Sequence, residues 1–144
     1  MEAVRPHAQF TKAYGQSFGA GYTAIAWDSA PLASGISLNT TTSAFTVSRA
    51  GTYAFNTGLR NGLGSNTWHG ISVLTTNGAV VGKSYATGQV TPDSAEGHTW
   101  HLLASLSTDT TYYISLYRQT GMTVSTPGDP AAGYAIVATI TYAS

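Results

Sequence analysis

The sequence predicts an all-β protein with the architecture of a jelly-roll β-sandwich. Sixteen glycines and five prolines interrupt the 144-residue chain at short intervals. The segments between them are rich in Thr, Val, Ile and Tyr, which favour strands. The last third of the chain holds three apolar strand patterns, at 100–106, 112–117 and 133–142. A chain of this length is expected to form one domain with a sizeable core.

Alternation of apolar and polar residues places the earlier strands, because side chains point to opposite faces along a strand. A turn at Arg49-Ala-Gly51 joins two alternating segments into a hairpin, and Asn77-Gly78 joins a second pair. Asn-Gly between apolar segments is a strong hairpin signal. The residues expected on the apolar side of the first hairpin are Phe45, Val47, Tyr53, Phe55 and Leu59. The earlier strands are expected at 23–27, 44–48, 52–59, 67–74 and 79–81.

Residues 1–20 differ from the rest of the chain. They contain Pro6, the aromatic residues Phe10, Tyr14 and Phe18, and glycines at 15 and 19, with a third glycine next to the segment at 21. We expect an N-terminal arm over 1–20 that docks on another protein, followed by the jelly-roll domain over 21–144. The arm residues expected to make this contact are Arg5, His7, Phe10, Tyr14 and Phe18.

Charge is the most unusual property of the composition. Charged residues make up 8% of the chain, against about 25% in typical soluble proteins, and six basic residues balance six acidic ones. Such a surface favours association with other subunits. The basic residues are scattered singly, which argues against a nucleic-acid partner. The chain has no cysteine, and no segment has the apolar length of a signal peptide or a membrane span.

Candidate catalytic and metal-binding patterns are weak. Gly15-Gln-Ser17-Phe-Gly19 matches a hydrolase nucleophile motif, but that motif requires a strand before it and a helix after it. His98 and His101 are three residues apart in an expected strand, so their side chains would face opposite ways. The acidic residues are dispersed. We therefore expect no enzymatic activity, no metal and no cofactor.

Aromatic residues are the remaining candidates for ligand binding. Three Trp and nine Tyr could offer rings that stack on sugars, beside Asn and Thr groups that bond to hydroxyls. Most of these rings are expected to fill the core or a subunit interface. The candidates for receptor contact are Trp68, Trp100, Asn66 and Tyr85.

The run Phe45-x-Val47-x-x-x-Gly51-x-Tyr53-x-Phe55 resembles the early signature of the complement first-component globular head, whose family shares its fold with tumour necrosis factor. The later order of strands agrees, so the resemblance covers about 22–142. It implies a jelly roll that packs as a compact homotrimer around a threefold axis. Bacteriophage virions use the same fold, and a chain without a collagen stalk, an export signal or an acidic calcium cluster is more similar to those proteins.

An apolar, aromatic last strand favours a subunit interface there. The residues expected at the trimer interface are Tyr113, Tyr117, Tyr134, Ile136, Ile140 and Tyr142. If the last strand turns its other face to the axis, Val137 and Thr139 take that role.

These observations lead to a functional expectation. The protein is expected to be a non-enzymatic virion structural protein, a trimeric capsid decoration (cement or head-spike) protein of a bacteriophage, assembled in the host cytoplasm. Its partners would be the major capsid protein or other virion proteins, without nucleic acid or membrane insertion. The alternative is the receptor-binding head of a tail fibre or spike that recognises a host surface saccharide. A secreted cytokine-like ligand and an enzyme rank lower.

Overall fold

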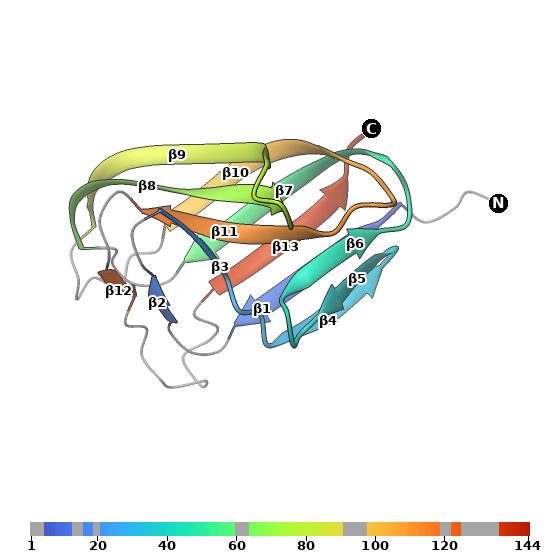
Figure 1. The fold of residues 1–144 in the computed structure, drawn as a ribbon, viewed down its shortest axis with the longest axis horizontal. Coiled ribbons are helices and arrows are strands. Elements are labelled where there is room, and N and C mark those ends of the chain that lie inside the picture. The colour runs from blue at the N-terminus through green and yellow to red at the C-terminus, as the bar shows by residue number, and fades with distance from the viewer. Residues whose placement is uncertain are drawn as a thin grey trace.

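The computed structural model describes residues 5–12, 16–18, 21–59, 64–90, 98–118, 122–124 and 136–144. Two antiparallel sheets lie against each other and enclose the core (Figure 1). A separate two-stranded ribbon pairs β2 (Gln16–Phe18) with β12 (Met122–Val124). None of the described residues belongs to a helix long and apolar enough to cross a membrane. The predicted all-β sandwich is confirmed.

The first sheet has five strands, all antiparallel to their neighbours. In spatial order the strands are β10 (His98–Leu106), β7 (Gly51–Leu59), β13 (Ile136–Tyr142), β1 (His7–Lys12) and β4 (Ser29–Ser34). The central strand of the sheet is the last one of the chain, β13, which lies between β7 from the middle of the chain and β1 from its beginning.

The second sheet has five strands in one path and a sixth, β3 (Gly21–Ala24), that pairs with the far end of β11. In spatial order the path is β5 (Ile36–Asn39), β6 (Ala44–Val47), β11 (Tyr112–Arg118), β8 (Gly64–Thr75) and β9 (Val80–Val90). The predicted hairpin at Asn77-Gly78 is confirmed, because β8 and β9 pair on either side of it. There, Gly78 has a φ of +85°, a backbone conformation that glycine adopts without steric cost.

Aromatic rings form the centre of the core. The ring of Phe45 lies 5.6 Å from Phe10, 6.0 Å from Phe55 and 5.8 Å from Tyr112, measured between ring centroids. Phe10 also contacts Trp27 at 5.8 Å. Each such pair adds about 0.5–1.5 kcal/mol beyond the apolar area that it buries. The core therefore joins both sheets through contacts between residues far apart in the sequence.

The alternation predicted for the first hairpin is confirmed for Phe45, Val47, Tyr53 and Phe55, which are all buried. The side chain of Leu59 lies outside the described ones. Sequence reasoning missed β4 and β5, whose short polar segments give little apolar signal.

The predicted arm is wrong for part of its length. Residues 7–12 form β1, which pairs with β13 on one side and with β4 on the other (Figure 1). Ala8 and Phe10 are 1% and 0% exposed, so Phe10 is a core residue and is not available to a capsid. The physical reason is a two-residue period, with Ala8 and Phe10 facing inward and His7, Gln9 and Thr11 on the opposite side.

The other predicted arm residues differ in their outcome. Arg5 is exposed, and its carbonyl oxygen pairs with His7 Nδ1 at 2.9 Å. His7 is half-buried. Tyr14 lies outside the described residues, and Phe18 is placed on β2 without a described side chain. The arm boundary at residue 20 therefore does not separate two parts of this structure.

Candidate interaction faces

The outer face of the five-stranded sheet consists of three rows that cross all five strands. Each row follows the register from β4 through β1, β13 and β7 to β10. Because four of its residues are threonines, we call this surface the threonine face. The rows are Leu32, Gln9, Thr139, Asn56 and His101; Ser34, His7, Thr141, Ala54 and Leu103; and Ser29, Thr11, Val137, Gly58 and Thr99.

The threonine face carries no Lys, Arg, Asp or Glu in these rows. Two leucines stand at its opposite edges, with Leu32 on β4 at 54% exposed and Leu103 on β10 at 65%. Its polar groups bond to one another: His101 Nδ1 pairs with Asn56 Oδ1, and Thr11 Oγ1 lies 2.9 Å from Ser29 Oγ. These rows are therefore uncharged, as the centre of a subunit interface commonly is, and the two leucines are exposed at their edges, while Thr11 is only 1% exposed.

The outer face of the second sheet is different. Along β11, the core side chains Tyr112, Ile114 and Leu116 alternate with outward residues at 111, 113, 115 and 117. Tyr22 on β3 lies opposite Tyr117, with ring centroids 5.0 Å apart and ring planes tilted by 51°. We call this surface, defined by Tyr22, Tyr113 and Tyr117, the tyrosine face.

A hollow of about 290 Å³ opens beside β11, at the end away from the Tyr22–Tyr117 pair. Five of its seven lining residues carry a hydroxyl or an amide group, and Leu38 and Ala44 are apolar. Asn39 is fixed there because its Oδ1 accepts hydrogen bonds from the backbone N–H groups of Thr41 and Thr42, at 2.9 and 3.3 Å. The polar residues of the lining are Ser37, Asn39, Thr42, Thr46 and Thr111.

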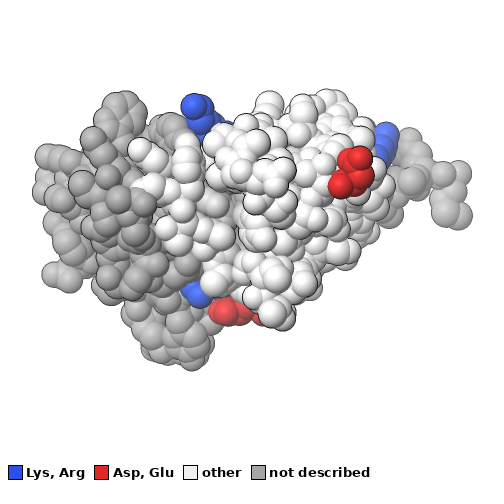
Figure 2. Space-filling model, in the orientation of Figure 1, with Lys and Arg blue, Asp and Glu red and all other residues white. Residues whose placement is uncertain are grey.

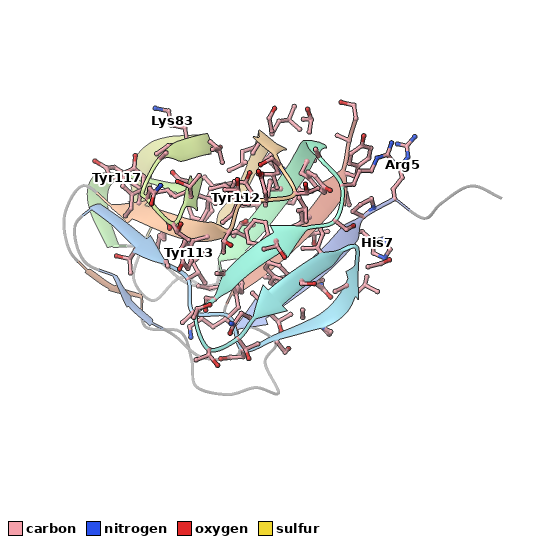
Figure 3. All side chains as sticks on the ribbon, turned by 45° about the vertical axis from the view of Figure 1, so that its right-hand side comes forward. Arg5, His7, Lys83, Tyr112, Tyr113 and Tyr117 are labelled. Carbon is pink, nitrogen blue, oxygen red and sulfur yellow. The ribbon has the colours of Figure 1, made fainter. Side chains whose placement is uncertain are left out.

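Charge is sparse on the visible surface. Figure 2 shows Lys, Arg, Asp and Glu atoms as a few separate patches with wide uncharged areas between them. In Figure 3, Arg5 and His7 lie at one end of the molecule, and Tyr117 and Lys83 lie toward the other. The side of the molecule seen in Figure 2 therefore presents no large cluster of charge among its described residues.

The arrangement of the two sheets matches known structures. Crystal structures of murine APRIL at pH 8.0 and at pH 5.0 are similar to this chain with TM-scores of 0.57 and 0.55. Each is 10% identical in sequence, and the match covers 96% of this chain and 99% of that chain. The chain has a tumour-necrosis-factor-like jelly-roll fold. No family model and no curated protein matches it, so the link to the complement first-component head stays a prediction.

In this tumour-necrosis-factor-like sandwich, the prediction for the last strand is wrong for Ile136 and Ile140. Both are 0% exposed because β13 is the middle strand of its sheet and turns these residues toward the core. The outward residues are Val137 and Thr139, both half-buried. The alternative face of the strand is therefore the one available to a partner.

The predicted aromatic part of the interface is divided between the two sheets. Tyr113 and Tyr117 do not lie beside the last strand, because β11 belongs to the opposite sheet. Tyr142 is half-buried at the end of β13, where its ring lies 5.4 Å from that of Tyr53 and 4.3 Å from the guanidinium carbon of Arg49. Tyr134 lies outside the described residues.

Among the predicted receptor contacts, Trp100 is wrong. It is 3% exposed and belongs to the core cluster, because it lies on the same side of β10 as Leu102 and Ala104. Asn66 and Trp68 lie on β8 and Tyr85 lies on β9, opposite Gly70, but their side chains are outside the described ones. The sequence did not predict Tyr22 as a candidate contact residue, because only the pairing of β3 with β11 places its ring beside that of Tyr117.

The structure does not support the nucleophile and metal-binding patterns of the sequence among its described residues. Ser17 is the middle residue of β2 and pairs with Thr123, which is not the strand-to-helix turn that a nucleophile motif requires. His101 bonds to Asn56. Within the described ranges, no group of three or more His, Cys, Asp or Glu residues could hold a metal ion. The absence of a metal, a cofactor and an enzymatic activity stays a prediction.

Proposed function

We propose that the protein is a non-enzymatic structural protein of a bacteriophage virion, which assembles as a homotrimer through the threonine face and decorates the capsid. The observation that carries the proposal is the uncharged threonine face with an exposed leucine at each edge. Leu32 and Leu103 lie on different edge strands. If one edge of a protomer binds the other edge of the next protomer, the subunits form a closed ring when the rotation between neighbours returns to the first subunit. Three subunits make the smallest such ring above a dimer.

The isolated protomer exposes apolar surface that assembly would bury. Leu103 is 65% exposed, and complete burial of a leucine side chain stabilises by about 1.5–3 kcal/mol. The central rows add Thr, Val and Asn side chains that need no counter-charge. Covering these uncharged groups costs less desolvation than covering charges would, provided that the hydroxyl and amide groups find hydrogen-bond partners in the contact. The chain has no cysteine, so its assembly does not depend on disulfide formation.

The oligomeric state is tested by light scattering on the purified protein. We expect three times the 15.0 kDa chain mass. Leu103→Lys should give the single-chain mass, because it places a charge in the covered contact. Val80→Lys is the matched control, since Val80 is 40% exposed on β9 and lies outside the threonine face. A single-chain mass for the unmodified protein, or no change with Leu103→Lys, contradicts the proposed interface.

The virion role is tested by mixing the protein with undecorated phage heads and sedimenting the particles. We expect co-sedimentation of the unmodified protein. Leu103→Lys should bind less because a monomer loses the multivalency of a trimer. Failure of the assembled protein to sediment with heads contradicts decoration.

A receptor-binding head of a tail fibre or spike is the second candidate, and the tyrosine face favours it. Tyr22 is 44% exposed on the sheet opposite the threonine face, so assembly through that face leaves it open to a ligand. Binding to host cells that a surface saccharide blocks, without binding to heads, would favour this candidate over decoration.

A further inference from the structure

We infer that the tyrosine face and the adjoining hollow form one elongated site for a linear, uncharged oligosaccharide. The inference rests on the receptor-binding candidate and names the surface that would serve it. The site differs from the receptor contacts that the sequence suggested, because it follows a single strand, β11, from the hollow at Thr111 to the Tyr22–Tyr117 pair.

The side chains of β11 that point away from the core determine how long the proposed site is. Thr111 lines the hollow, and Tyr113, Ser115 and Tyr117 follow on the same face. Since a strand rises about 3.4 Å per residue, positions 111 and 117 are about 20 Å apart. Such a length accommodates several linked sugar units, so a chain of sugars suits the site better than a single small molecule.

Small side chains between the two ends of the site are buried. Ser115 is 4% exposed, and Ser72, which pairs with it on β8, is 0% exposed. Larger neighbours therefore cover these small residues. An extended ligand can lie across such a surface without entering the core, in contact with the half-buried rings of Tyr113 and Tyr117.

The Tyr22–Tyr117 pair supplies the chemistry for one end. A tyrosine ring packs against the apolar C–H face of a sugar ring, and its hydroxyl group can bond to a sugar hydroxyl. The contact between the two rings, with centroids 5.0 Å apart, holds Tyr22 in place before a ligand arrives. Ordering that precedes binding reduces its entropic cost.

The hollow supplies the chemistry for the other end. Its hydroxyl and amide groups are the partners that sugar hydroxyls use, and Leu38 and Ala44 provide an apolar surface beside them. The turn that holds the rim is fixed, because Thr42 Oγ1 accepts a hydrogen bond from the Ala44 N–H at 3.3 Å. A volume of about 290 Å³ lies at the lower end of the range of ligand pockets, about 300–1,000 Å³, and suits one sugar ring.

The lack of charged residues in the lining of the site favours a neutral ligand. The residues that line it on β5, β6 and β11 are uncharged. Recognition of a phosphate or carboxylate would call for arginine or clustered lysine. Lys83 is the only charged residue in the cross-strand row that contains Ser72 and Ser115. A neutral oligosaccharide is therefore the occupant that this surface fits.

The test uses the full chain and three neutral hexasaccharides, maltohexaose, cellohexaose and chitohexaose, with heparin as an anionic probe. Binding is measured by saturation-transfer NMR and by titration calorimetry. We expect at least one neutral hexasaccharide to bind, and heparin not to compete. Tyr22→Ala should weaken that binding by tenfold or more, and Tyr22→Phe, which keeps the ring, by only a few-fold.

A second variant probes the other end of the site. Ser37 is exposed on β5 and lines the hollow, so Ser37→Trp should fill it and weaken binding by tenfold or more. Ser105→Ala is the matched control, because Ser105 is exposed on β10 in the opposite sheet, and it should bind like the unmodified protein. Each variant is accepted only if its mass and unfolding temperature match those of the unmodified protein, so that a folding defect is not read as lost binding.

Three results would overturn the inference: no neutral hexasaccharide binds, heparin binds instead, or binding is unaffected by both Tyr22→Ala and Ser37→Trp. These results leave the trimer and the virion role standing, because mass and head binding are measured separately. Binding to host cells that persists with both variants would keep the receptor-binding candidate and exclude this site.

Discussion

Phe10 on β1 lies opposite Ala138 on β13, and its completely buried ring contacts Trp27 and Phe45 across the core. The beginning and the end of the described chain are therefore neighbours in one sheet. The N-terminal strand is part of the fold, and any contact with a capsid must use residues other than Phe10.

We predict that Phe10→Ala lowers the free energy of unfolding by about 3–5 kcal/mol, because it removes a core ring and leaves a cavity. Gln9→Ala, on the outer face of the same strand, should change it by less than about 0.5 kcal/mol in the isolated protomer. Urea denaturation measures both. Equal effects of the two substitutions would show that β1 is not held in the sandwich.

Gly82 marks the close approach of β9 to β10. A Cβ atom there would lie 2.9 Å from Ala104 Cβ and 3.0 Å from both Leu102 Cδ1 and the Leu103 carbonyl oxygen. We predict that Gly82→Ala lowers the free energy of unfolding by about 1–3 kcal/mol, as overpacking does.

Gly58→Ala is the matched control for Gly82. Among the described residues, a Cβ at Gly58 would meet only Thr99 Oγ1, at 3.9 Å, which is an ordinary contact. In the isolated protomer, the thermal unfolding of Gly58→Ala should therefore be close to that of the unmodified protein. If Gly82→Ala unfolds at the same temperature as Gly58→Ala, the two edge strands are not packed as described.

Tyr53 links stability to alkaline pH. Its hydroxyl group donates to the Arg49 carbonyl oxygen at 2.6 Å. Burial, reinforced by the neighbouring Tyr142, raises the pKa of Tyr53 above its ordinary value of 10.0, and Arg49 partly opposes this. The folded state thus holds this proton more tightly than the unfolded state. The stabilisation is complete below pH 10 and is lost as the pH rises through the folded pKa.

We predict that Tyr53→Phe lowers the free energy of unfolding by about 1 kcal/mol at neutral pH, because one hydrogen bond is lost. Above pH 10, its stability should fall less steeply with pH than that of the unmodified protein. Urea denaturation at several pH values measures the two slopes. Parallel slopes above pH 10 would contradict this role of Tyr53.

The sequence predicts where the strands lie better than which side of each strand faces the core. Phe45 and Val47 indicate a buried side because the polar Thr46 separates them, and Asn77-Gly78 predicts its hairpin from local sequence alone. The last strand offers no such contrast. Ile136, Val137 and Ile140 are all apolar, so only the pairing of β13 between β7 and β1 decides which of them face the core.

The tyrosine face could not be predicted for a related reason. Tyr22 and Tyr117 are 95 residues apart in the numbering, and only the pairing of β3 with β11 brings their rings together. Likewise, the short β1 stands among Gly and Pro residues that indicate irregular structure, and the contacts of Phe10 with the core override that signal.

The central claim, that another copy of the chain covers the threonine face, is tested most directly by thiol labelling. Because the chain has no cysteine, a single introduced thiol reports on one position. Leu103→Cys places it at a site that is 65% exposed in the protomer, and Val80→Cys at one that is 40% exposed.

Both variants are labelled with a maleimide at a concentration where their mass is that of three chains, and again in denaturant. The account predicts that the Leu103→Cys thiol reacts at least tenfold more slowly than the Val80→Cys thiol in the native protein, and at the same rate in denaturant. A Leu103→Cys thiol that reacts as fast as, or faster than, the Val80→Cys thiol in the native protein would contradict the claim.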